Sequence, residues 1–192
     1  MGRNIKYGFL AGILFLVSCE YQAISPENYE AGQLYLPAAV NGVYLINEST
    51  KEPMTPNPTP GYAYRYILDR ENNRFNIPLS VYRGGVNAGG NVSVNISVYA
   101  DTIPQLIADE VLGDTVVLLP AGKYALENQV KFSQGSRTAP FTLAIDLDFL
   151  EANHPKMYVL PVKIGSDQQI CNPALSTAII AIDTQVIQND IQ

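Results

Sequence analysis

The sequence contains no tryptophan, a single histidine, His154, and only two cysteines, Cys19 and Cys171. A lone histidine excludes metal sites built on two or more imidazoles, and it leaves one possible base for a serine-based catalytic triad. No serine has the surroundings of an activated nucleophile, and no Gly-x-Ser-x-Gly elbow, phosphate-binding loop or dinucleotide-binding fingerprint occurs. We therefore expect no enzyme activity, no metal site and no cofactor, and a solvated loop position for His154.

Positive charge is also scarce. The chain has 12 Lys and Arg residues against 18 Asp and Glu, which gives a formal net charge of −6, and the cations are scattered. Binding to nucleic acid rewards clustered cations, and adhesion to anionic lipid needs a basic patch. We expect no nucleic-acid partner, and any attachment to a membrane must have another cause.

The first 19 residues supply that cause. Arg3 and Lys6 precede an apolar run from Tyr7 to Val17, and a small residue, Ser18, precedes Cys19. This is the layout of a secretory signal, and the run is shorter than the roughly 20 residues of a membrane-spanning helix. Its end, Leu-Val-Ser-Cys, resembles the lipobox of bacterial lipoproteins, which implies cleavage after residue 18 and lipidation of Cys19. The alternative is an ordinary signal peptide in which Cys19 is incidental.

Removal of residues 1–18 takes two basic residues and no acidic ones, so the net charge of the remaining chain becomes −8. Residues 19–32 are polar and without periodicity, which predicts a flexible tether. Glu20, directly after the cysteine, resembles the acidic export signal of some surface lipoproteins of Bacteroidetes and favours exposure at the cell exterior. If Cys19 is lipidated, Cys171 has no disulfide partner; its neighbours carry no cation, so we expect a packed, unreactive thiol.

Residues 33–186 are predicted to form one domain, followed by a short tail, residues 187–192. Short apolar runs separated by turn-forming residues are typical of an all-β domain. Residues 91–100 alternate most regularly, and one short helix is expected within residues 101–112, before Gly113. The other expected strands are residues 42–47, 62–68, 74–82, 116–119, 125–132, 139–147, 157–164 and 177–182. Because each sheet must bury one face, these elements predict a two-layer, immunoglobulin-like β-sandwich with one short helix.

Tyr62, Tyr64 and Tyr66 recur at every second position of an expected strand and should therefore project from one face. Exposed, such a row could stack on sugar rings while its hydroxyl groups form hydrogen bonds. Buried, it would be the core side of an edge strand, and Arg65 on the opposite face favours this alternative. The three tyrosines are the candidate ligand-binding residues of the sequence.

Two groups of carboxylates need a separate interpretation. Asp146 and Asp148 are two residues apart, and Asp109, Glu110 and Asp114 cluster near the end of the expected helix. Glycosidases use paired carboxylates, and oxygen-rich loops bind calcium. Solvated surface positions are the simpler explanation of both groups, with a calcium site as the main alternative, so no catalytic or metal site is assigned to them.

The order of several short elements resembles a family of Bacteroidetes surface-lipoprotein domains of unknown function, the kind found as the N-terminal module of some surface endo-β-N-acetylglucosaminidases. The matching pieces extend from about Gln33 to Thr184. The chain departs from the family in two ways: its expected helix is poor in Tyr and Asn, and the sequence ends eight residues after Thr184. Family members often continue at that point into a catalytic or lectin-like module. The pieces are an alternating strand at 91–100, Leu118-Leu119-Pro120 with Tyr124, a strand and turn at 130–135, and Tyr158-Val159-Leu160-Pro161. The resemblance implies a β-sandwich without chemistry of its own.

Together these features predict a non-catalytic outer-membrane lipoprotein, anchored through Cys19 and facing the cell exterior. Its expected role is accessory to glycan binding or uptake, with oligosaccharide or envelope proteins as partners. The alternative is a structural or adhesive surface subunit without a sugar ligand. Such a subunit could accept a donor strand at an open edge near residues 74–82.

Overall fold

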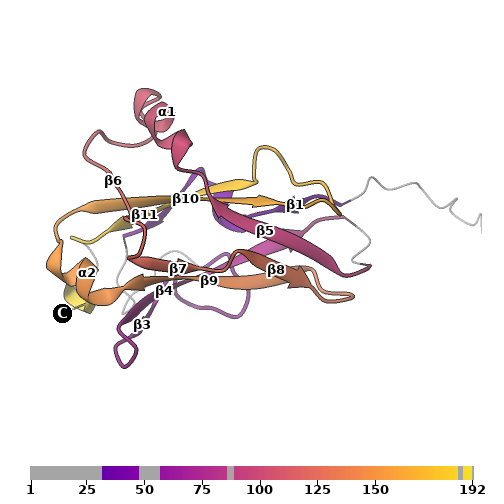
Figure 1. Cartoon of the computed structure of the whole chain (residues 1–192), viewed down its shortest axis with the longest axis horizontal. Helices are drawn as coiled ribbons and strands as arrows, with labels where there is room; N and C mark the ends of the chain where they lie inside the picture. Colours follow the sequence, from indigo (N-terminus) through magenta and orange to yellow (C-terminus); the bar gives the residue numbers. More distant parts are fainter. Residues whose placement is uncertain (1–31, 48–56, 86–88, 186–187, 192) are drawn as a thin grey trace, which may run out of the picture.

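Two β-sheets stacked face to face form the body of the protein in the computed structural model, which describes residues 32–47, 57–85, 89–185 and 188–191 (Figure 1). The signal segment 1–18, Cys19 and most of the tether lie outside these ranges. None of the helices within them has the length and apolar character that crossing a bilayer requires. The predicted two-layer β-sandwich is confirmed.

The first sheet has the strand order β1-β4-β9-β7, and β3 also pairs with β4; every pair in it is antiparallel. Its centre is the long ladder between β4 and β9, in which Phe75 pairs with Ile145 and Tyr82 with Thr138. The bounds are β1 Leu34–Tyr35, β3 Ile67–Asp69, β4 Arg74–Arg83, β7 Tyr124–Leu126 and β9 Thr138–Asp146.

The second sheet has the order β2-β11-β10-β5-β8, with β6 also paired to β10. The pairs β2–β11 and β6–β10 are parallel and the others antiparallel. The bounds are β2 Val43–Ile46, β5 Val92–Val98, β6 Val117–Leu118, β8 Gln129–Phe132, β10 Met157–Gly165 and β11 Thr177–Asp183. β2 is one edge of this sheet.

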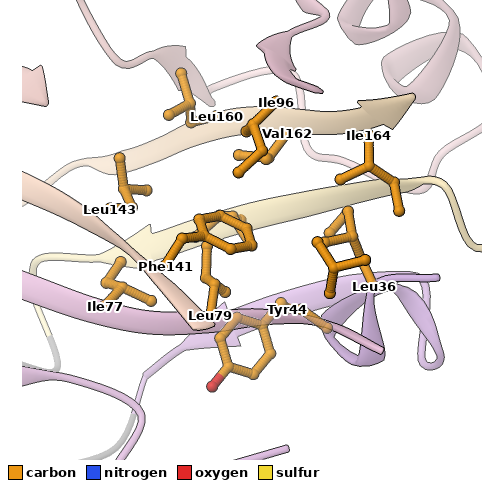
Figure 2. Close-up of a cluster of buried hydrophobic side chains, with 14 of the residues drawn as sticks. Leu36, Tyr44, Ile77, Leu79, Ile96, Phe141, Leu143, Leu160, Val162 and Ile164 are labelled. Atoms are coloured by element: carbon orange, nitrogen blue, oxygen red, sulfur yellow. The ribbon is translucent and has the colours of Figure 1, made fainter. Parts of the chain in front are cut away.

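The core fills the space between the two sheets with the inward side chains of both (Figure 2). In β5 the predicted alternation is confirmed: Val92, Val94 and Ile96 are buried, whereas Asn95 and Ser97 are exposed. Full burial of an aliphatic side chain contributes roughly 1.5–3 kcal/mol, so this inward row fixes which face of the strand meets solvent.

The helix α1, Ile103–Ala108, lies on the outer face of the second sheet, as Figure 1 shows. Together with Leu112 it covers Val159 of β10 and both Ile179 and Ala181 of β11. These two strands are therefore buried on both faces, which explains why they are continuous apolar runs in the sequence. The hydrophobic cluster beneath α1 includes no residue of β5 or β8, so it leaves the outer face of these two strands uncovered.

Two further short helices were not predicted, α2 at Leu147–Ala152 and α3 at Gln188–Ile191. The predicted strand at residues 125–132 is in fact two strands, β7 and β8, that belong to different sheets. Both sheets enclose the same core, and every second residue points inward in β7 and, without a shift, again in β8. The alternation in the sequence therefore does not reveal that the chain passes from one sheet to the other.

Candidate functional site

The three predicted tyrosines do not share a strand face, so this part of the prediction is wrong. Only Ile67–Asp69 form a strand, and residues 62–66 precede it as irregular chain with a bend at 63–65. Tyr62 and Tyr64 are exposed, at 39% and 41%, whereas Tyr66 is 2% exposed and stacks on Phe75 with ring centroids 4.5 Å apart. Tyr66 is thus a core residue, and a role in ligand binding remains a prediction for Tyr62 and Tyr64 only.

Local hydrogen bonds explain why this segment is a loop. The Asn57 side chain accepts a bond from the Thr59 amide and donates one to the Tyr64 carbonyl, each 2.7 Å long. Gly61 has a φ of +89°, which side chains with a Cβ atom rarely adopt. Such side chain–backbone bonds compete with a strand ladder. The tyrosines therefore alternate in the sequence without belonging to a β-strand.

Beside this loop, at the outer edge of β2, lies a cavity of about 260 Å³ that we call the edge pocket. Arg65 spans it: its Nη1 atom donates a 2.5 Å hydrogen bond to the Leu45 carbonyl, and its guanidinium carbon lies 4.8 Å from the centre of the Tyr44 ring. The pocket is lined by Pro37, Ala38, Asn41, Val43, Tyr44, Pro58 and Arg65.

A second depression, of about 320 Å³, lies on the uncovered outer face of the second sheet, and we call it the sheet-face groove. β5 and β8 place Asn95 opposite Gln129, and the Gln129 amide donates a 3.0 Å hydrogen bond to the Asn95 side-chain carbonyl. All the lining residues are polar: Ser93, Asn95, Gln129, Asp167 and Gln168.

The segment after β10 closes one side of this groove. The Gln168 side-chain oxygen accepts a 2.6 Å hydrogen bond from the Ser93 amide, and Ser166 donates one of 2.7 Å to the Ser93 carbonyl. Gly165, paired with Asn95, carries no side chain, and a Cβ atom there would meet nothing within 4 Å. The sheet is therefore open at Gly165, beside Asn95.

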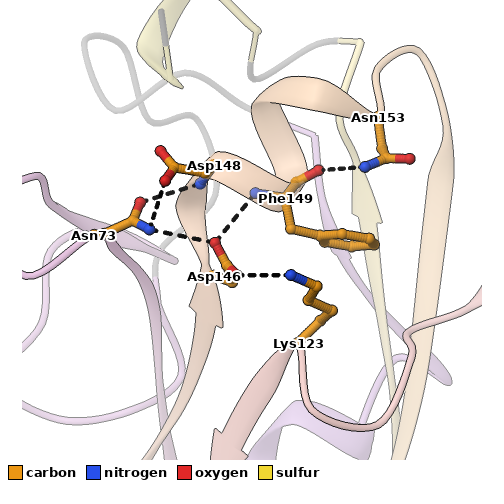
Figure 3. A network of polar contacts seen from close by, with 6 residues as sticks. All are labelled: Asn73, Lys123, Asp146, Asp148, Phe149 and Asn153. Carbon is orange, nitrogen blue, oxygen red and sulfur yellow. Dashed lines mark hydrogen bonds and ion pairs between the residues drawn. The ribbon is translucent and has the colours of Figure 1, made fainter.

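Asp146 and Asp148 take part in a structural network rather than a catalytic pair (Figure 3). Asp146 caps α2 by accepting a 3.2 Å hydrogen bond from the Phe149 amide, and it forms a 3.0 Å ion pair with Lys123. Asn73 donates to both carboxylates. The hydrogen bond from Lys123, the largest cause, holds the pKa of Asp146 below its ordinary value. Both carboxylates are thus used by the fold.

The remaining chemical candidates do not converge. Within the described ranges no group of three His, Cys, Asp or Glu side chains could hold a metal ion. Asp109 accepts a 2.8 Å hydrogen bond from Gln105 on α1, and His154 is exposed in a loop. Cys171 is half-buried against the core, and burial raises the pKa of its thiol. Its surroundings match the expected unreactive cysteine.

Sequence reasoning missed both the edge pocket and the sheet-face groove. Each combines residues that are far apart in the chain, such as Leu45 with Arg65 and Asn95 with Gln129. The only available signal was the polar outward row of residues 91–100, which marked a solvated face without showing what lies beside it.

A family model whose description reads "-like, N-terminal domain" matches residues 39–170, which is more than half of the chain. A comparison with curated proteins found no match.

Three solved structures from Bacteroides are similar. A candidate carbohydrate-binding protein from Bacteroides ovatus aligns with a TM-score of 0.54 and 16% identity, over 79% of this chain and 36% of its own. A multidomain Bacteroides ovatus protein that includes DUF1735 aligns with a TM-score of 0.53 and 15% identity, over 78% and 44%. EndoBT-3987 of Bacteroides thetaiotaomicron, solved with a Man5GlcNAc product, aligns with a TM-score of 0.44 and 14% identity, over 56% and 26%.

The chain spans less than half the length of each of these three structures. At such identities the first two likenesses establish a common fold and nothing about ligands.

Proposed function

The chain belongs to the family described as "-like, N-terminal domain", and from this membership we propose that it is a non-catalytic, outer-membrane lipoprotein that assists glycan binding or uptake at the cell surface. The family and fold that the residues predicted are confirmed by the family match and by the β-sandwich shared with Bacteroides proteins. That one of these is a candidate carbohydrate-binding protein supports the proposal by analogy.

The sheet-face groove is the observation on which the proposal depends. A sugar hydroxyl group both donates and accepts hydrogen bonds, so its best partners are side chains that do the same. Once Gln129 has donated to Asn95, the pair still offers the Asn95 amide as a donor and the Gln129 carbonyl as an acceptor. The Asp167 carboxylate forms no hydrogen bond within the described residues and adds an acceptor. The groove thus presents donors and acceptors in the mixture that sugar rings require.

Neighbouring groups can extend this surface. Tyr99, at the end of β5, is 42% exposed, and the Lys163 ammonium lies 4.2 Å from the centre of its ring. An exposed aromatic ring beside polar side chains is a surface on which the apolar face of a sugar can pack. The groove is shallow, so we expect weak binding that relies on several sugar units or on several copies of the protein at a surface.

Attachment to the membrane rests on the N-terminal sequence. Cys19 lies outside the described residues, and the lipobox-like segment before it supports lipidation there. The acyl chains on a lipidated cysteine contribute about 0.8 kcal/mol of binding free energy for each methylene group buried in the membrane, so two or more acyl chains give stable anchoring. Glu20 supports export to the outer face of the outer membrane.

The alternative of a donor-strand acceptor finds less support. The outer edge of β4 pairs with β3 at one end and with β1 at the other. Between them, the buried Thr59 donates a 3.2 Å hydrogen bond from its hydroxyl to the Pro78 carbonyl. The edge near residues 74–82 is therefore occupied in part by this protein's own loop, which leaves little of the apolar opening that strand addition needs.

The experiment is a glycan array with the full-length chain in detergent. We expect the double substitution Asn95→Ala/Gln129→Ala to abolish binding, and Tyr62→Ala/Tyr64→Ala to report whether the tyrosine loop also contributes; Tyr66 is left intact because it belongs to the core. The matched control is Gln105→Ala/Asp109→Ala, which removes another exposed hydrogen-bonded pair, at the end of α1. Absence of binding by the folded wild type contradicts the proposal, and equal binding by the groove variant contradicts the site.

A further inference from the structure

Two residues that line the edge pocket each carry a buried hydrogen-bonding atom without a partner in the described part of the chain: the hydroxyl oxygen of Tyr44 and the Nε atom of Arg65. Both atoms are buried, and Tyr44 as a whole is only 4% exposed. In Figure 2 the Tyr44 ring lies at the margin of the core and its hydroxyl points away from the other labelled side chains. Buried polar groups are nearly always satisfied, so two unsatisfied groups in one pocket indicate a place where a ligand supplies the missing partners.

The orientation of Arg65 is fixed by the fold. Its Nη1 atom donates to the Leu45 carbonyl at the outer edge of β2, and its guanidinium lies over the Tyr44 ring. On the opposite side of the guanidinium, formed by Nε and Nη2, the buried Nε atom has no partner within the described part of the chain, where the side-chain hydrogen bond of Arg65 comes from Nη1. Two parallel N–H groups on one side of an arginine match the two oxygens of a carboxylate.

Charge favours the same ligand. None of the residues that line the pocket is acidic, and Arg65 is its single cation. The chain as a whole carries a net charge of −6, so this pocket is a local exception to an acidic surface. One guanidinium neutralises one carboxylate, whereas a phosphate dianion would leave excess negative charge buried. Burial raises the pKa of Tyr44, against a smaller opposing effect of Arg65, so the hydroxyl stays protonated and can donate a third hydrogen bond.

The size and walls of the pocket suit a small ring. Its volume of about 260 Å³ is below the roughly 300–1,000 Å³ of pockets for drug-sized ligands. Apart from Asn41, the walls beside Tyr44 and Arg65 are apolar and rigid: Pro37, Ala38, Val43 and Pro58. One sugar ring presents an apolar face that such walls can contact.

We propose that the edge pocket binds the carboxylate of an acidic sugar, a hexuronic acid unit of a glycan. The Nε and Nη2 atoms of Arg65 grip the carboxylate, and the Tyr44 hydroxyl donates to one of its oxygens. The glycan part of this assignment rests on the function proposed above, and the carboxylate part rests on the pocket alone.

The test measures binding of three probes to the full-length chain in detergent by saturation-transfer NMR and titration: methyl glucuronide, methyl glucoside and glucose 6-sulfate. We expect methyl glucuronide to bind at least about tenfold more tightly than the neutral glucoside, because one charge-assisted bidentate contact is absent from the latter. Arg65→Gln should abolish this preference. Tyr44→Phe, which keeps the ring under the guanidinium, should weaken glucuronide binding about threefold to tenfold.

The matched control is Arg74→Gln, the same charge change at an exposed arginine whose side chain has no hydrogen bond or ion pair within the described residues. Equal affinity for glucuronide and glucoside, or unchanged affinity in the folded Tyr44→Phe variant, overturns the inference. So does a preference for the sulfate ester over the carboxylate. Array binding of neutral glycans without a glucuronide preference leaves the proposed function intact and removes only this inference. Glucuronide binding that depends on Arg65, without any signal on the array, supports this inference and contradicts the function proposed for the sheet-face groove.

Discussion

The hydroxyl group of Tyr66 donates a 2.5 Å hydrogen bond to the Oδ2 atom of Asp190, a residue 124 positions later in the chain. The Tyr66 ring stacks on Phe75 of β4, and Arg70 donates a 2.7 Å hydrogen bond to the Asp190 backbone carbonyl. This end of the sandwich and the helix α3 are therefore joined through one buried tyrosine. The residue that looked like a ligand-binding candidate in the sequence instead holds the C-terminal segment on the domain.

Substitution of Tyr66 by Phe should lower the free energy of unfolding by about 1.5–3 kcal/mol, the usual cost of a buried hydrogen bond to a charged group. The ring and its stacking on Phe75 are kept, so only the hydroxyl is tested. Urea denaturation followed by circular dichroism measures the change. Tyr62→Phe, at an exposed position, should change stability by less than about 0.5 kcal/mol. Equal stability of the Tyr66→Phe variant and the wild type would show that the contact with Asp190 contributes nothing.

The strands could be predicted where burial repeats along the chain. β5 and β9 alternate because one face of each meets the core, and β10 and β11 are continuous apolar runs because α1 covers their outer face. The same reasoning gives the wrong answer for residues 62–66. Their tyrosines recur at every second position, but the segment does not pair with a strand, because side-chain hydrogen bonds of Asn57 hold it as a loop.

The candidate sites could not be predicted in the same way. The sheet-face groove depends on the pairing of β5 with β8, and the edge pocket depends on Arg65 reaching the Leu45 carbonyl. Neither proximity leaves a periodic signal, because both arise from tertiary contacts between polar side chains. A single sequence therefore shows which faces are polar, but not which polar side chains meet.

Arg83 is the most deeply buried charged residue of the described chain, at 1% exposure, and no carboxylate pairs with it there. Its guanidinium donates to the carbonyls of Gly89 and Gly90 and lies 4.6 Å from the centre of the Phe132 ring. Burial also lowers the pKa of this arginine. The carbonyls belong to exposed glycines, so water can replace the arginine as their donor.

We therefore expect Arg83→Lys to destabilise the protein by about 2 kcal/mol, because lysine keeps the buried charge but loses the planar fork and its stacking. Arg83→Met should cost less, about 1 kcal/mol or below, because it removes the charge and retains most of the packed volume. Thermal and urea denaturation of both variants measure the difference. Arg83→Met more unstable than Arg83→Lys would mean that the hydrogen bonds to the glycine carbonyls outweigh desolvation of the charge.

Cys171 should react slowly in the folded protein. Its thiol is half-buried, and burial raises its pKa, against a smaller opposing effect of a backbone hydrogen bond involving Ser166. Since the thiolate is the reactive form, alkylation at neutral pH should be at least about tenfold slower than in urea. The measurement uses a Cys19→Ala variant, so that only one thiol is present. Rapid labelling of the folded variant would contradict a packed, unreactive thiol at Cys171.

Asp146 should make stability depend on pH in acid solution. Its carboxylate caps α2 and pairs with Lys123, so its pKa in the folded protein lies below the ordinary value of 3.8. A carboxyl group with a depressed pKa contributes its full stabilisation above the ordinary value and loses it as the pH falls through the folded value. Asp146→Asn keeps an oxygen for the Phe149 amide but removes the charge that Lys123 requires.

At pH 7 we expect Asp146→Asn to cost no more than about 1 kcal/mol, since the ion pair is partly exposed to solvent. Asp146→Ala should cost about 1–2 kcal/mol, because it also removes the cap. As the pH is lowered towards about 2, protonation of the wild-type carboxyl should bring its stability towards that of the asparagine variant, while both stay above the alanine variant. Urea denaturation at neutral, weakly acidic and strongly acidic pH measures the three curves. If the gap between wild type and Asp146→Asn is the same at every pH, Lys123 and Asp146 are not electrostatically coupled, and the network in Figure 3 acts through its hydrogen bonds alone.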